Sequence, residues 1–184
     1  MDSSETKRPL LVLDLDETLV SADDEARGIP GEVAFAEHHV VPRPGLAHFL
    51  RDVRASYDIA IWTASTAEYA APIVRHFVNV PLVFLWARAR CTLHSDINTR
   101  DWVYLKDIKK LVRTGYAKER ILIVDDTPAK IARSYGNYVR IAPFEGDLAD
   151  EDLKFLAPYL LSIAATENMR SLDKRGWRNR AIKK

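Results

Sequence analysis

Short apolar runs, each bounded by polar residues, recur along the chain and predict the buried strands of a sheet. They cover residues 10–15, 57–62, 82–86, 121–124 and 137–141. Runs rich in Leu, Val and Ile without strict alternation are typical of strands that are covered on both faces.

Segments with apolar residues at helical spacing lie between these runs. A helix is predicted after Pro44, because Leu46, Phe49 and Val53 repeat at helical intervals and proline suits the first helical position. Further helices are predicted over residues 66–77, 106–112 and 150–165. A loop is predicted over 21–31 and an extended segment over 37–41, and the pattern over 88–104 fits either short strands or loops. This alternation predicts an α/β fold, with a Rossmann-like, largely parallel sheet in three layers.

Length and composition favour one globular domain. The chain has 184 residues, 47% hydrophobic and 29% charged, with a formal net charge of +1, so its overall charge gives no support for nucleic acid or a membrane as an obligatory partner. Cys91 is the single cysteine, which excludes an internal disulfide. The polar start and the lack of a long apolar run lead us to expect a cytoplasmic protein with no membrane span.

Polar residues follow three of the predicted strands. The pairs are Asp14 and Asp16, Thr63 and Ser65, and Asp125 and Asp126. The carboxyl ends of parallel strands share one edge of a sheet, where ligands of open α/β sheets bind. We therefore expect these side chains to converge on one site.

The Asp14-Leu15-Asp16 segment places two carboxylates close together. Side chains two apart on an extended chain point to the same side, and their charges repel unless a cation lies between them. Magnesium prefers such hard oxygen ligands and leaves positions open for phosphate oxygens. A capping or turn role is the alternative, but the second acidic pair at Asp125 and Asp126 favours a metal site.

The segment 14–20 (DLDETLV) resembles the first motif of the haloacid dehalogenase superfamily of phosphatases. Further matching segments follow in the expected order: 43–45 (RPG), 62–65 (WTAS), 104–108 (YLKDI) and 124–128 (VDDTP). Together they resemble the branch of small C-terminal-domain phosphatases of RNA polymerase II and NLI-interacting-factor-like proteins. The resemblance covers residues 10–165.

This resemblance implies a role for each matching residue. Asp14 would attack phosphorus and form an aspartyl-phosphate, and Asp16 would act as general acid and then general base. Thr63 and the Ala64 amide would hold phosphoryl oxygens, and Lys106 would neutralise phosphate charge and orient Asp14. The resemblance also implies a bound Mg²⁺, held by the Asp14 carboxylate, the Asp16 carbonyl and Asp126, with Asp125 holding a metal-bound water.

Simpler roles compete with several of these assignments. Thr63 or Ser65 is also a candidate helix N-cap, and Lys106 a solvated lysine at the start of a helix. Thr18 is expected to be a local hydrogen-bonding residue. Arg88 and Cys91 resemble an Arg-x-x-Cys stretch in which the arginine lies near the substrate, whereas Cys91 and His94 themselves are expected to be packing or surface residues.

The spacing between motifs leaves room for a small insert but for no large cap domain. About 26 residues separate Glu17 from Pro44 and about 40 separate Ser65 from Lys106, which is short for a domain. An open site admits a bulky phosphomonoester, so a phosphoserine or phosphothreonine protein is the favoured substrate. Nucleic-acid ends or small phosphoesters are the alternative, and a non-catalytic binding protein is a third possibility that the intact motif residues disfavour.

The predicted organisation is a disordered leader over residues 1–8, a phosphatase domain over 9–168 and a basic C-terminal tail over 169–184. The tail carries seven Lys and Arg residues against one acid, Asp173. A solvated, disordered end is the favoured interpretation, and attraction to an anionic partner or membrane surface is the alternative.

Overall fold

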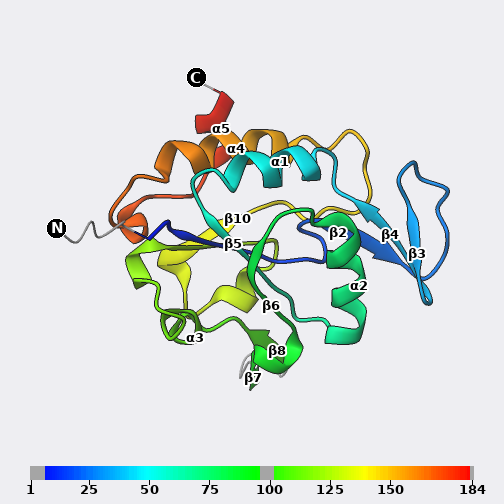
Figure 1. Cartoon of the computed structure of the whole chain (residues 1–184), viewed down its shortest axis with the longest axis horizontal. Coiled ribbons are helices and arrows are strands. Elements are labelled where there is room, and N and C mark those ends of the chain that lie inside the picture. The colour runs from blue at the N-terminus through cyan, green and yellow to red at the C-terminus, as the bar shows by residue number, and fades with distance from the viewer. Residues whose placement is uncertain (1–6, 96–101, 183–184) are drawn as a thin grey trace.

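A five-stranded parallel sheet forms the centre of the molecule. The computed structural model describes residues 7–95 and 102–182, with side chains as far as residue 180. The strand order is β10-β9-β1-β5-β6. Figure 1 shows β5, β6 and β10 of this sheet in the interior of the molecule. The strands are β1 (Leu10–Leu13), β5 (Asp58–Trp62), β6 (Leu82–Trp86), β9 (Ile121–Asp125) and β10 (Tyr138–Arg140). The predicted parallel sheet is therefore confirmed.

Helices cover both faces of this sheet, which explains why its central strands β1, β5 and β9 are largely apolar. Leu11 and Leu13 of β1 pack in a core with helices α1, α2 and α4, whereas Leu10 and Val12 face a second core that includes α3. The helices are α1 (Leu46–Val53), α2 (Ala67–Phe77), α3 (Ile108–Val112), α4 (Asp152–Ile163) and α5 (Trp177–Ile182). Two helical layers around one sheet match the predicted three-layer α/β class.

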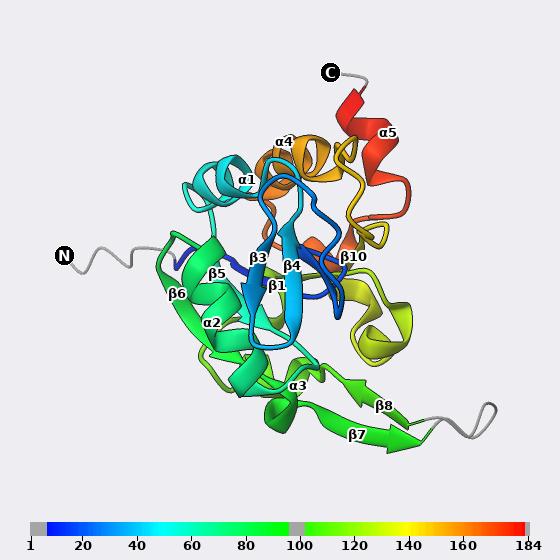
Figure 2. The same ribbon diagram turned by 90° about the vertical axis from the view of Figure 1, so that its right-hand side faces the viewer.

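Two small β structures are inserted between the elements of this core. The first is an antiparallel sheet in the order β2-β4-β3, formed by β2 (Val20–Asp23), β3 (Val33–Phe35) and β4 (His38–Pro42). The second is the antiparallel pair β7 (Thr92–Ser95) and β8 (Trp102–Leu105), which projects from the body in Figure 2. No large cap domain is present in the described part of the chain.

The loop predicted over residues 21–31 is wrong at its start. Strand β2 takes Val20–Asp23 and pairs antiparallel with β4 from Val20↔Pro42 to Asp23↔His39. The local sequence VSAD carries little apolar signal, so pairing across the insert decides its conformation. The beginning of this region is therefore part of a sheet.

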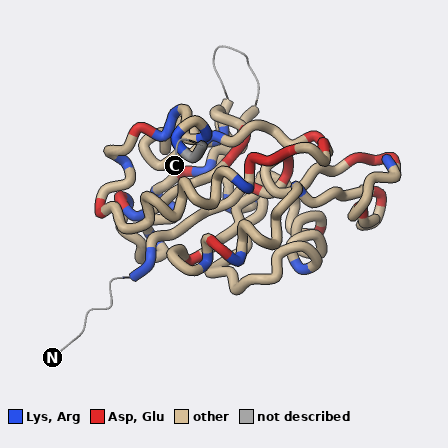
Figure 3. Tube along the Cα trace, turned by 90° about the horizontal axis from the view of Figure 1, so that it is seen from above, with Lys and Arg blue, Asp and Glu red and all other residues tan. Residues whose placement is uncertain are grey.

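The basic tail also differs from the solvated end that the sequence predicted. Trp177 of α5 is buried in the core beside α4, and its indole Nε1 donates a 2.6 Å hydrogen bond to the Arg140 carbonyl. Lys174 is buried as well, with its ammonium bonded to the Met169 and Leu172 carbonyls, both at 2.8 Å. The basic residues Arg170, Arg175, Arg178 and Arg180 are exposed. Figure 3 shows Lys and Arg positions close to the C-terminal end of the trace. The leader predicted over residues 1–8 lies outside the described residues except for Lys7 and Arg8.

A buried arginine joins the segment after β1 to the start of α4. The Arg43 side chain is fully buried and donates to both carboxylate oxygens of Asp150, at 2.8 and 2.7 Å. It also donates to the Thr18 carbonyl at 3.2 Å and the Ala142 carbonyl at 3.0 Å. A bidentate, planar donor of this kind fixes geometry as well as charge. Arg43 therefore fixes the chain that follows the first acidic motif.

Candidate active site

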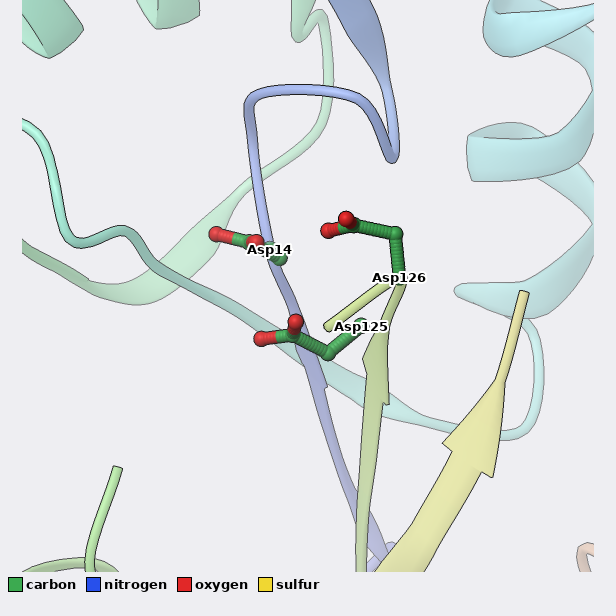
Figure 4. Close-up of side chains that lie close together, drawn as sticks. All are labelled: Asp14, Asp125 and Asp126. Carbon is green, nitrogen blue, oxygen red and sulfur yellow. The ribbon is translucent and has the colours of Figure 1, made fainter. Parts of the chain in front are cut away.

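Three aspartates meet at the carboxyl end of β1 and β9. The two strands are parallel neighbours, and the Asp14 amide donates to the Val124 carbonyl at 3.0 Å, directly beside Asp125. One carboxylate oxygen from each of Asp14, Asp125 and Asp126 lies within 4.8 Å of the others (Figure 4). All three residues are buried. The structure thus brings together two of the sequence motifs that lie more than a hundred residues apart.

Lys106 connects two of these aspartates. Its ammonium lies 2.7 Å from Asp14 Oδ1 and 2.6 Å from Asp125 Oδ2, and its side chain is fully buried. The alternative of a solvated lysine at a helix start is wrong, because Lys106 precedes α3 in the interior. The backbone places it there through a 2.8 Å hydrogen bond from the Lys106 amide to the Lys130 carbonyl.

The electrostatics of the cluster differ from one carboxylate to the next. Burial alone would raise the pKa of Asp14, but Lys106 and Lys130 outweigh it and hold the pKa below its usual range. Burial, together with the charge of Asp14, raises the pKa of Asp125 to about 7 despite the nearby lysines. Asp14 is therefore ionised at neutral pH, as an attacking carboxylate must be.

Lys130 is a site residue that the sequence analysis missed. Its ammonium donates to Asp14 Oδ2 at 3.1 Å and lies 3.8 Å from Asp126 Oδ1. Burial would lower its pKa, but the three carboxylates, Asp14 most strongly, hold it above the usual value. Lys130 lies on a 3-10 turn, Pro128–Ile131, just after the last acidic pair. Its distance of four residues from Asp126 was the available signal.

The Asp16 carboxylate is turned away from this cluster and is held by three hydroxyl groups. Thr63 and Ser65 donate to its Oδ2 at 3.1 and 2.7 Å, and Tyr69 donates to its Oδ1 at 2.6 Å. Tyr69 was also missed by the sequence analysis. It lies in the first turn of α2, three residues after the N-cap, where it faces the loop that follows β1. The separation of Asp14 and Asp16 gives the two carboxylates different surroundings.

The alternative in which Thr63 or Ser65 caps the helix after β5 is wrong. Thr66 is the N-cap of α2 and accepts from the Tyr69 amide, so neither Thr63 nor Ser65 caps this helix. Thr63 is buried, and its hydroxyl, which donates to Asp16, also accepts from the Ser65 amide at 3.0 Å. Its contact with phosphate, like that of the Ala64 amide, stays a prediction.

Arg88 lies next to the site on its exposed side. Its Nε donates to the Ala64 carbonyl at 2.7 Å, and its guanidinium stacks 5.1 Å from the centre of the Tyr104 ring. It lines a hollow of about 380 Å³ together with Ser65, Tyr69 and His38 from the inserted sheet. This hollow adjoins the residues that hold Asp16, and the contact of Arg88 with a substrate stays a prediction.

Three other residues are placed outside this chemistry or near its edge. Cys91 is half-buried and packs against the second core, with its sulfur 3.6 Å from the Thr63 carbonyl, and His94 is exposed on β7. The Thr18 hydroxyl is buried and has no hydrogen-bond partner within residues 7–95 and 102–182, so its expected side-chain hydrogen bond is not found.

The donor set fits a divalent cation and distinguishes the two aspartates at the end of β9. Both oxygens of Asp125 are engaged, Oδ1 by the Thr127 amide at 2.9 Å and Oδ2 by Lys106. Asp126 Oδ1 is buried and has no hydrogen-bond partner among the residues described. An unpaired buried carboxylate oxygen is costly unless a cation is bound. Asp126 is therefore the better candidate for a direct ligand, and the Asp16 carboxylate is not part of the cluster.

The comparisons with known proteins show the family and agree with this fold. A profile of the NLI interacting factor-like phosphatase family matches residues 9–170, and the chain belongs to this family. A probable C-terminal domain small phosphatase of Dictyostelium discoideum is 30% identical over 167 residues, covering 87% of this chain and 52% of that protein. The human carboxy-terminal domain RNA polymerase II polypeptide A small phosphatase 1 is 29% identical, covering 88% and 62%. The chain thus spans between half and two thirds of the length of these relatives.

A solved structure confirms the haloacid dehalogenase-like fold class. The fission yeast RNA polymerase II CTD phosphatase Fcp1, bound to beryllium fluoride, superposes with a TM-score of 0.58 at 16% identity, covering 89% of this chain and 53% of that one. Among the described residues, no helix is long and apolar enough to cross a bilayer.

Proposed function

We propose that this protein is a magnesium-dependent phosphatase that hydrolyses phosphomonoesters through an aspartyl-phosphate on Asp14. The observation that carries the proposal is the buried, ionised Asp14 between two lysines and beside the Asp125–Asp126 pair. A carboxylate nucleophile needs charge neutralisation where an anionic phosphate approaches. Membership of a phosphatase family supports the same conclusion.

In the first half of the reaction, a carboxylate oxygen of Asp14 attacks phosphorus and the bond from phosphorus to the leaving oxygen breaks. Asp16 donates the proton that the leaving oxygen requires. In the second half, Asp16 takes a proton from water, which attacks the phosphorus of the aspartyl-phosphate and releases phosphate and free Asp14. Lys106 holds Asp14 in position and neutralises charge, and Thr63 and the Ala64 amide bind phosphoryl oxygens.

The Asp14 carboxylate, the Asp16 carbonyl and Asp126 would hold the magnesium ion, and Asp125 would orient a water bound to it. When bound, the ion supplies positive charge that neutralises the phosphate oxygens. The orphaned oxygen of Asp126 and the engaged oxygens of Asp125 support this division of roles.

Phosphoserine or phosphothreonine in a protein is the proposed substrate, and residues 9–168 are the proposed catalytic domain. The small inserts leave the rim beside Arg88 open, which suits a phosphate on a polymer. Relatives named as phosphatases of the polymerase C-terminal domain support a protein substrate. Nucleic-acid ends and small phosphoesters are the alternative. A cytoplasmic location remains part of the proposal, although other relatives are named nuclear envelope morphology proteins.

The first test is hydrolysis of para-nitrophenyl phosphate with magnesium or with EDTA. We expect turnover by the wild type with magnesium, loss of turnover in Asp14→Asn, and no change in Asp52→Asn, whose side chain is half exposed on α1. A folded, metal-loaded wild type without turnover would leave a non-catalytic binding role as the better explanation.

The substrate class is tested separately with a phosphoserine peptide and a 5′-phosphorylated oligonucleotide at equal concentration. A higher kcat/KM for the peptide supports the proposal. Preference for the oligonucleotide, with an affinity that falls steeply with salt, supports the alternative.

A further inference from the structure

The position of Lys130 raises a question about how a cation enters the site. Its ammonium bonds to Asp14 Oδ2 and lies 3.8 Å from Asp126 Oδ1, while Lys106 lies 2.7 Å from the other oxygen of Asp14. Both oxygens of Asp14 therefore have an ammonium group against them. Asp14 and Asp126 are the two carboxylates assigned above as direct ligands of magnesium.

We propose that Lys130 is an internal competitor of the metal ion: its ammonium occupies the cation position between Asp14 and Asp126 and must withdraw when a divalent cation binds. The inference rests on the metal site of the proposed function and extends it to the metal-free state. Lys130, and not Lys106, is the lysine that would compete with the metal ion.

The charge balance of the site supports this competition. Three buried carboxylates, Asp14, Asp125 and Asp126, lie beside two lysines, so these five groups carry one net negative charge if all are ionised, and Glu17 adds a further carboxyl beside Asp126. Removing Lys130 would leave three carboxylates with one lysine. Conversely, a divalent ion and an ammonium at the same two oxygens would repel strongly, because the site is screened little by water.

Lys130 is able to withdraw, whereas Lys106 is confined. The Lys106 side chain is fully buried between two carboxylates, but that of Lys130 is 21% exposed. The Lys130 backbone is fixed by two hydrogen bonds, from its amide to Thr127 O at 3.1 Å and from the Lys106 amide to its carbonyl. Rotation of the side chain alone therefore suffices, and the turn that carries Lys130 keeps its conformation.

The test is a binding measurement that does not depend on turnover. Isothermal titration calorimetry with MgCl₂ and with MnCl₂ is performed on the wild type, Lys130→Met and Lys130→Arg, with Lys109→Met as the matched control on the exposed start of α3. We expect Lys130→Met to bind both ions at least about tenfold more tightly. Lys130→Arg keeps the charge and should bind close to the wild type, as should Lys109→Met.

Thermal unfolding provides a second readout of the same variants. In EDTA, Lys130→Met should unfold at a lower temperature than the wild type, because the carboxylates have lost a partner, and magnesium should raise its Tm by more than it raises that of the wild type. A variant that folds only with magnesium would show the same effect in extreme form.

Equal or weaker metal binding by folded Lys130→Met would overturn the competition. If the wild type binds metal and Lys130→Met does not differ from it, the metal site of the proposed function stands and only the role of Lys130 falls. If no variant binds either ion at millimolar concentration, the metal site and the competition fall together.

Discussion

Removal of Lys106 should destabilise the metal-free protein strongly. In Lys106→Met the chain length is nearly kept, but the ammonium that lies 2.6 Å from Asp125 and 2.7 Å from Asp14 is lost. Both aspartates and the lysine side chain are essentially inaccessible to water. Removing one partner of a buried ion pair leaves an uncompensated charge and costs about 3–5 kcal/mol of unfolding free energy.

The loss of unfolding free energy in Lys106→Met should depend on pH, because Asp125 becomes neutral when it takes up a proton. Burial raises the pKa of Asp125 to about 7 even with Lys106 present, and loss of the lysine removes a partner that lowers it. The destabilisation should therefore be larger at pH 8 than at pH 5.5. In the double variant Lys106→Met/Asp125→Asn, removal of the second charge should recover about 1–2 kcal/mol at pH 8 without restoring turnover.

Urea unfolding in EDTA, followed by tryptophan fluorescence, measures these free energies at both pH values, and para-nitrophenyl phosphate hydrolysis with magnesium measures turnover. A loss below about 1 kcal/mol at pH 8, or a double variant no more stable than Lys106→Met, would refute the reasoning. Either result would mean that the Lys106–Asp125 pair is not an important source of stability.

Two further predictions concern the acid/base residue and the pH dependence of stability. Tyr69→Phe removes the hydroxyl that donates to Asp16 at 2.6 Å, so kcat should fall about tenfold while KM and Tm change little. The control Tyr135→Phe, at a residue that is 65% exposed, should match the wild type. An unchanged kcat in Tyr69→Phe would show that Tyr69 does not position Asp16. A second prediction concerns the wild type in EDTA. Asp125 has a pKa of about 7 in the folded protein and 3.8 when unfolded, so its protonation favours the folded state. This contribution is complete below pH 3.8 and is lost as the pH rises toward about 7. Unfolding free energy should therefore fall between about pH 5 and 7 by up to about 1.4 kcal/mol per pH unit, and Asp125→Asn should reduce the slope; an equal slope in Asp125→Asn would contradict the assignment.

Much of the fold and the location of the site could be predicted from sequence. The apolar runs identified the strands of the central sheet because a strand covered on both faces must be apolar throughout. The acidic pairs after β1 and β9 were expected to meet because parallel strands end at a common edge, and the structure places Asp14, Asp125 and Asp126 together.

Other features depended on contacts that no local pattern records. The short strand β2 forms because β4 pairs with it, and Trp177 is buried because the tail returns over the core beside α4. Both contacts join segments whose own composition is polar or mixed. Composition alone therefore predicted a loop and a solvated end.

The sequence by itself determined the α/β class, the order of the motifs and the acidic residues at the ends of the strands, because these follow from local hydrophobicity and chain direction. The tertiary structure alone decided that Lys130 faces Asp14 and Asp126, and that Tyr69 holds Asp16. An isolated lysine or tyrosine near a helix start has many possible neighbours. Packing between distant segments selects one, and that selection sets the charge and hydrogen bonding of the site.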